Sequence, residues 1–251
     1  MRNWKKGLTA ALLGLMACMP ISSHAYVVQD AEDQVALIAS MRSVWDVPSE
    51  PVGTIGYMVT DLDSNGRLEI MVSQLVGTGN YTYTDVYEVT PDKQGLSLCE
   101  KEWNEEKSEV DWLSQNEVPM YFDWLDGTEW YVVGDFERDN YGETHWNLRG
   151  VALQDGILKE KPICQSDTYY DDRGNSHTVY YNAEGAVISS VGFKAQEKTV
   201  FAGKEKRIIF FPWLMYFGGQ WEDWQNKSEE DIRFMLMDTY LNFAGEKEGM
   251  G

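Results

Sequence analysis

Basic residues are scarce in this chain of 251 residues, which has 21 lysines and arginines against 41 aspartates and glutamates. The first 25 residues hold three basic residues and no acid, so the remainder carries 18 minus 41, or −23. A field of that sign excludes a protein that binds nucleic acid or an anionic membrane through general positive charge. Hydrophobic residues make up 43%, which is enough apolar material for a folded core.

Histidine is equally scarce, and the common catalytic motifs are missing. Of three histidines, His145 and His177 follow residue 25, which leaves little for a histidine-based triad or a zinc site. The sequence has no G-x-S-x-G, H-E-x-x-H, phosphate loop, dinucleotide fingerprint or C-x-x-C pair. A carboxylate pair for glycoside hydrolysis stays open, because 41 acids offer many pairs. An enzyme is therefore the less favoured interpretation.

Long apolar runs are absent apart from residues 8–17, which are too few to cross a membrane. Arg2, Lys5 and Lys6 precede this run, and Ser23-His24-Ala25 provides small residues at the −3 and −1 positions of a cleavage site. This pattern predicts a signal peptide over residues 1–25 and export of residues 26–251, with no transmembrane span.

The three cysteines leave two alternatives for the export signal. Leu15-Met16-Ala17-Cys18 resembles the lipobox of bacterial lipoproteins, and that resemblance implies acylation at Cys18 and a lipid anchor. Conventional cleavage after Ala25 would instead give a secreted, periplasmic or cell-surface protein with Cys99 and Cys164. An even pair in an oxidising compartment makes these two residues a candidate disulfide.

The residues after the signal predict a mainly β domain with a helix at each end. Acids at residues 30–33 precede a helical apolar stripe that reaches Trp45. Residues 52–217 are short runs rich in Val, Ile, Tyr, Thr and Trp between Gly, Asn and Asp, a texture typical of antiparallel hairpins. A last helix is expected to begin at the N-cap Ser228.

The β region also matches itself at an offset of about 60 residues. Asn65-Gly66 corresponds to Asp126-Gly127 at an offset of 61, and Glu69 corresponds to Glu129 at an offset of 60. These landmarks predict internal repeats near residues 57–103 and 119–164 within a single domain, as meander units in a propeller-like or stacked β array. The alternative is chance similarity among glycine-containing turns.

The most specific chemical motif is the segment Asp61-Leu62-Asp63-Ser64-Asn65-Gly66-Arg67-Leu68-Glu69. Oxygen side chains at the first, third and fifth positions can converge on one hard cation, and the glycine permits a tight turn. The carbonyl group at the seventh position and the acid at the ninth can complete the site. The candidate ligands of a structural calcium ion are Asp61, Asp63, Asn65, Arg67 and Glu69.

This loop resembles the calcium loops of EF-hands and of FG-GAP and VCBS repeats. An EF-hand requires a bidentate acid at position twelve, where this chain has Val72, and the flanks look like strands. The resemblance to FG-GAP and VCBS units implies a secreted β array. The second copy keeps only Asp123, Asp126 and Glu129, as expected if it has lost the ion. The alternative for the first loop is an ordinary hairpin turn on an acidic surface.

These observations favour an exported, calcium-stabilised, non-enzymatic β domain that acts as a binding or cell-surface module for an unknown glycan or protein ligand. Clustered tryptophans such as Trp221 and Trp224 could stack on sugars, although most such rings pack in cores. A structural envelope lipoprotein and an extracellular carboxylate-based hydrolase are the alternatives.

Overall fold

A computed structural model describes residues 22–46, 53–76, 81–103, 110–138, 142–171, 173–217 and 220–248. Its contacts divide the chain into two units, residues 1–33 and 34–251. Helix α1 (Ser22–Ser40) crosses this division and contains the predicted cleavage site at residues 23–25. The apolar run of residues 8–17 and the lipidation candidate Cys18 lie outside the described residues. Among those described, no helix is long and apolar enough to span a membrane.

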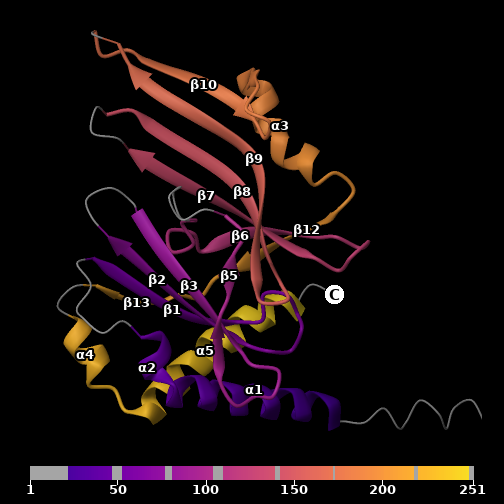
Figure 1. Cartoon of the computed structure of the whole chain (residues 1–251), viewed down its shortest axis with the longest axis vertical. Coiled ribbons are helices and arrows are strands. Elements are labelled where there is room, and N and C mark those ends of the chain that lie inside the picture. Colours follow the sequence, from indigo (N-terminus) through magenta and orange to yellow (C-terminus); the bar gives the residue numbers. More distant parts are fainter. Residues whose placement is uncertain are drawn as a thin grey trace, which may run out of the picture. The chain divides into compact units, whose positions relative to one another are not determined.

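Two antiparallel sheets make up most of the second unit, so the mainly β prediction with helices near both ends is confirmed. The first sheet has the order β13-β1-β2-β3-β4 (Figure 1). Its strands, in that order, are Leu214–Phe217, Thr54–Thr60, Glu69–Val76, Tyr81–Val89 and Leu96–Leu98.

The second sheet has the order β11-β10-β9-β8-β7-β6-β12, and β5 (Glu100–Lys101) adds to β9 as a short parallel strand. Its antiparallel strands from β6 to β12 are Glu117–Phe122, Glu129–Arg138, Thr144–Gln154, Ile157–Tyr170, Ser176–Asn182, Val187–Ile188 and Glu205–Phe210. Both sheets are open within the described residues, so a propeller-like closure is not the architecture.

The strand order corresponds between the two segments predicted as repeats. β1 to β4 form a meander in one sheet, and β6 to β9 form a meander in the other. The first hairpin of each meander turns through a glycine in the left-handed region, Gly66 with φ +80° and Gly127 with φ +77°. The flank of each first strand is occupied by a strand from the C-terminal part of the chain, β13 beside β1 and β12 beside β6.

One hydrophobic core joins the two sheets. Met58 and Met71 from the first sheet pack in the same cluster as Met120 and Tyr131 from the second, and all four side chains are fully buried. This cluster explains why both sheets have apolar inward faces, since each covers the other.

Helix α5 (Glu229–Glu248) covers β1 and confirms the expected start at Ser228. The Ser228 hydroxyl accepts a hydrogen bond from the Asp231 amide at 3.1 Å, and the Asp231 carboxylate accepts one from the Ser228 amide at 3.3 Å. This is a capping box with Asp in place of Glu. The helix buries Ile232, Leu236 and Phe243, and Thr239 accepts a hydrogen bond from the Val59 amide.

Three short helices complete the described structure. The N-terminal helix ends at Ser40, and α2 (Arg42–Trp45) follows as a separate turn. Helix α3 (Ser190–Val200) interrupts the region expected to be all β, and α4 (Trp221–Gln225) precedes α5. Phe193 packs α3 against Trp146 and Tyr180 of the second sheet. The segment was expected to be β because α3 has no buried residue to create a helical apolar stripe.

Candidate cation site between strands β1 and β2

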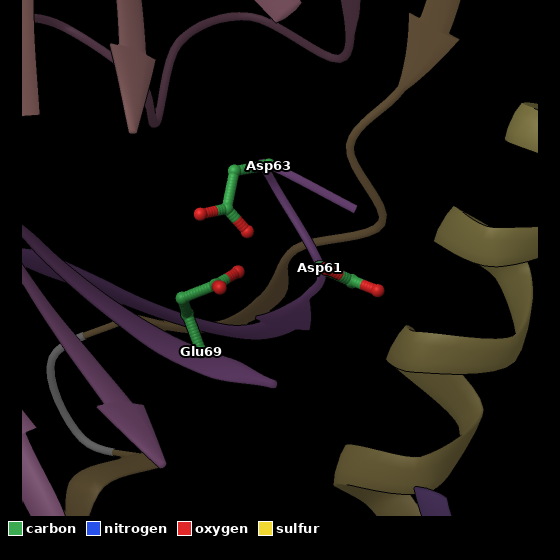
Figure 2. A group of neighbouring side chains, drawn as sticks. All are labelled: Asp61, Asp63 and Glu69. Carbon is green, nitrogen blue, oxygen red and sulfur yellow. The ribbon is translucent and has the colours of Figure 1, made fainter. Parts of the chain in front are cut away.

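Pairing of Thr60 with Glu69 closes the hairpin between β1 and β2 around residues 61–68. This closure brings together carboxylate oxygens of Asp61, Asp63 and Glu69, all within 4.8 Å of one another. Figure 2 shows the carboxylates of Asp63 and Glu69 facing each other, with Asp61 beside them at the end of β1. Asp61 and Asp63 are partly exposed, whereas Glu69 is fully buried.

Backbone hydrogen bonds fix the loop that carries these acids. The Asp61 carboxylate accepts from the Gly66 amide at 3.3 Å, and the Asp63 carboxylate accepts from the Asn65 amide at 3.2 Å. Gln34 donates to the Gly66 carbonyl and accepts from the Leu68 amide, both at 2.9 Å. The carboxylates are therefore held at defined positions in a turn of the kind that short polar side chains stabilise.

Glu69 is the unusual member of the group. Its Oε2 accepts hydrogen bonds from the Thr60 hydroxyl at 2.9 Å and from the Leu62 amide at 2.8 Å. Its buried Oε1 has no hydrogen-bond partner among the residues that the structure describes. Burial raises the pKa of Glu69 well above its ordinary value of 4.5, and the charge of Asp61 raises it further. An ionised Glu69 is thus an under-compensated buried anion.

A second buried glutamate lies directly opposite Glu69 on the neighbouring strand. Glu69 pairs with Glu88 across β2 and β3, and like charges in that position repel. Arg67 lies 2.8 Å from Glu88 Oε1, and the Asn65 amide group donates to the same oxygen at 2.7 Å. Burial nevertheless raises the pKa of Glu88. The guanidinium group of Arg67 compensates the negative charge of Glu88 because the two groups form an ion pair.

Of the five predicted ligands, the structure places three, Asp61, Asp63 and Glu69, in one cluster of carboxylates. The Asn65 amide nitrogen also donates to Asp63 at 2.9 Å, and its oxygen accepts from the Arg67 backbone at 2.7 Å. Asn65 and the Arg67 side chain therefore brace the loop in this structure. The sequence does not predict Glu88 as a neighbour of Glu69, because its proximity depends on the β2–β3 register, which no local pattern reveals.

The acids in the equivalent turn of the second meander make separate contacts and do not gather in one cluster among the residues that the structure describes. Asp123 forms an ion pair with Lys204, which lowers the pKa of that carboxyl group. Asp126 accepts a hydrogen bond from the Thr128 amide at 2.9 Å. Glu129 instead turns toward the first loop, where its Oε1 accepts from the Ser64 hydroxyl at 3.1 Å.

The predicted disulfide between Cys99 and Cys164 is wrong for this structure, in which both are free, buried thiols. Glu100 pairs with Ile157 in parallel register, so Cys99 lies level with Gly156, eight residues before Cys164 on β9. That separation is roughly 25 Å along a strand, far beyond the reach of a disulfide. Each cysteine also belongs to a different hydrophobic cluster.

The other sequence candidates do not form a site with these acids. His145 lies 2.8 Å from Asp167 on neighbouring strands, as a half-exposed pair. Trp221 and Trp224 are 8% and 0% exposed, so they are core residues and offer no ring face to a sugar. Trp124 is 69% exposed at the turn between β6 and β7.

Comparison with protein-family models, with curated proteins and with solved structures finds no match to this chain. The function is therefore inferred from the geometry of the chain's own residues.

Proposed function

We propose that this protein is an exported β domain whose first hairpin holds one structural calcium ion, and that it acts as a non-enzymatic binding or cell-surface module. In this proposal, the carboxylates of Asp61, Asp63 and Glu69 are the ligands of the calcium ion. We also propose that the two meanders are an internal repeat of which the first alone retains the ion.

The observation that carries the cation proposal is the fully buried carboxylate of Glu69. One of its oxygens has no hydrogen-bond partner in the described part of the chain, and the group faces Asp63 within a set of three acids (Figure 2). Burying ionised groups without compensation is strongly unfavourable, and a bound cation would offset both the desolvation and the mutual repulsion.

The chemistry of the site favours calcium over other common ions. The three side chains offer oxygen only, whereas zinc in proteins is usually held by Cys or His ligands. Calcium accepts irregular sets of carboxylates, carbonyl groups and waters, and magnesium demands a nearly ideal octahedron. A loop fixed by backbone hydrogen bonds, with carboxylates of unequal exposure, suits the more tolerant ion.

A role in binding, without catalysis, agrees with the placement of the acids. Glu69 and Glu88 have raised pKa values, as a general acid requires, but are 0% and 4% exposed, so a substrate could not reach them. Export is supported by the signal-like pattern of residues 1–25. The ligand class stays a glycan or a protein.

Thermal unfolding with calcium and with chelator tests the ion site. Calcium at a hundred times its dissociation constant should add about 2.7 kcal/mol, or roughly 5 to 10 °C in a domain of this size. The variant Asp63→Asn keeps a hydrogen-bond acceptor in the turn and should lose most of this shift. Asp126→Asn, in the equivalent turn of the second meander, is the matched control and should keep the shift.

The ion proposal is wrong if millimolar calcium does not change the melting temperature of the wild-type protein. The loop is then an ordinary hairpin turn. Export has a separate test, since the N-terminal residue of protein recovered from the producing cell distinguishes the alternatives. Tyr26 at the N-terminus indicates conventional cleavage, acylated Cys18 indicates a lipoprotein, and an intact Met1 contradicts export.

A further inference from the structure

Positive charge gathers around α3 and β12, in contrast to the acidic character of most of the chain after residue 25. Residues 194–207 contain five basic side chains and two acids, for a local charge of +3, while the whole chain carries −20. The basic residues are Lys194, Lys198, Lys204, Lys206 and Arg207. This local reversal of sign is independent of the cation site.

The four lysines of this set line one cavity of about 540 Å³ that is open to solvent. Lys194 and Lys198 come from α3, Lys204 from the turn after it, and Lys206 from β12. The cavity also includes Tyr121 of β6, whose ring stacks on Phe201 at 4.4 Å between centroids. Figure 1 labels α3 and β12, two of the elements that contribute these side chains.

The lysines of this cavity are only partly neutralised. Lys204 forms an ion pair with Asp123, and Lys206 lies 2.7 Å from Glu197 Oε1. Lys194 and Lys198 make no ion pair with any residue that the structure describes. The cavity therefore presents two uncompensated positive charges, one helical turn apart, a spacing at which like charges repel.

Contacts beside the lysines hold Glu197 and Lys206 at one side of the cavity. Glu197 Oε1 accepts hydrogen bonds from the Tyr121 hydroxyl at 2.6 Å and from Lys206, so this acid is already engaged. Lys161 lies 4.0 Å from the centre of the Trp130 ring, and burial together with the charge of Lys204 lowers its pKa. The charges of Asp123 and Asp126 act on this pKa in the opposite direction, so the acids beside the cavity offset part of the effect of Lys204.

We propose that this cavity is a binding site for a phosphate group, either as a free phosphate or as the headgroup of an anionic lipid. Two uncompensated ammonium groups match the charge of a phosphate monoester, which is about −1.5 to −2 at neutral pH. Each ammonium group has three donors for the phosphate oxygens. Lys204 and Lys206, which are paired with Asp123 and Glu197, line the same cavity and have further N–H donors beyond those pairs. The volume leaves room for the organic group that carries the phosphate.

The test uses the full-length protein and its double variant Lys194→Gln/Lys198→Gln. Glutamine keeps the helix propensity of these exposed positions while removing both charges. The matched control is Lys159→Gln/Lys227→Gln, which changes the net charge equally outside the cavity. Inorganic phosphate and pyrophosphate are titrated by calorimetry, and phosphatidylcholine vesicles with and without phosphatidic acid are tested by co-sedimentation.

The wild type and the control should bind one of these probes saturably, and the cavity variant should bind it at least about tenfold more weakly, the loss expected for one charge-assisted contact. Binding to free phosphate supports a soluble ligand, and binding only to phosphatidic acid vesicles supports a lipid headgroup. The proposal is wrong if the wild type binds none of the probes, or if the control loses as much affinity as the cavity variant. The same binding experiment can be carried out on chelator-treated protein, so its outcome does not depend on whether the cation site is occupied.

Discussion

The hydroxyl group of Tyr131 lies 2.9 Å from the carbonyl oxygen of Leu62, and this contact ties the first hairpin to the second sheet. Tyr131 is fully buried in β7, and the same hydroxyl is 3.0 Å from Glu129 Oε2. Ser64 strengthens the link through its hydrogen bond to Glu129. An ion that fixed the loop would thereby stabilise both sheets.

Replacing Tyr131 with phenylalanine should destabilise the protein by about 1 to 3 kcal/mol, because the buried Leu62 carbonyl loses its donor while the ring is retained. Urea unfolding measures this loss. Tyr83→Phe, at a tyrosine that is 55% exposed, is the control and should change stability by less than about 0.5 kcal/mol. Equal losses in the two variants would contradict a specific role for the Tyr131 hydroxyl.

The variant Glu69→Gln should be more stable than the wild type in chelator at neutral pH, and it should no longer respond to calcium. A neutral amide removes the buried charge, keeps an acceptor for Thr60 and Leu62, and can donate to the neighbouring aspartates. The expected gain is about 1 to 3 kcal/mol. Glu184→Gln, at an exposed turn, should leave both quantities unchanged. A calcium shift that survives in Glu69→Gln would exclude Glu69 as a ligand.

Stability in chelator should fall as the pH rises above the ordinary glutamate pKa of 4.5. Burial raises the pKa of Glu69 and of Glu88 in the folded state. Above pH 4.5 the folded protein therefore binds more protons than the unfolded chain. Linkage then makes the pH slope of the unfolding free energy negative. Calcium favours the ionised carboxylates and should flatten this slope. Urea unfolding at about pH 5 and about pH 7.5 checks the sign, and a stability that rises with pH in chelator would refute it.

Cys99 and Cys164 should both be alkylated by iodoacetamide in denaturant without reductant, because no disulfide joins them. In the native protein both should react slowly, since burial raises the pKa of Cys164 to about 11 and raises that of Cys99 further. Mass spectrometry of the labelled peptides distinguishes the two. If both cysteines stayed unlabelled in denaturant, a disulfide between them would be supported and the free thiols contradicted.

Local chemistry explains which parts of the fold could be predicted from the sequence. The capping residues at Ser228 and the glycine turns at Gly66 and Gly127 act within a few residues, so their patterns are visible in the chain. The oxygen spacing of residues 61–69 predicted three acids that the structure does bring together. The ion itself stays a prediction.

The remaining features depend on contacts between distant segments. Tyr131 meets Leu62 across 69 positions of the chain, and no periodicity marks either residue as a partner. The open sheets could not be told from a propeller, because both architectures present the same run of meanders. Helix α3 lacks an apolar stripe, since it covers the second sheet with few side chains such as Phe193.

The two strands nearest the C-terminus have a consequence for how the chain is made. β12 flanks the first strand of one meander and β13 flanks the first strand of the other, although β13 and its neighbour β1 are more than 150 residues apart in the chain. Both sheets therefore stay unfinished until residues 205–217 have left the ribosome, with long-range pairings of the kind that slow folding.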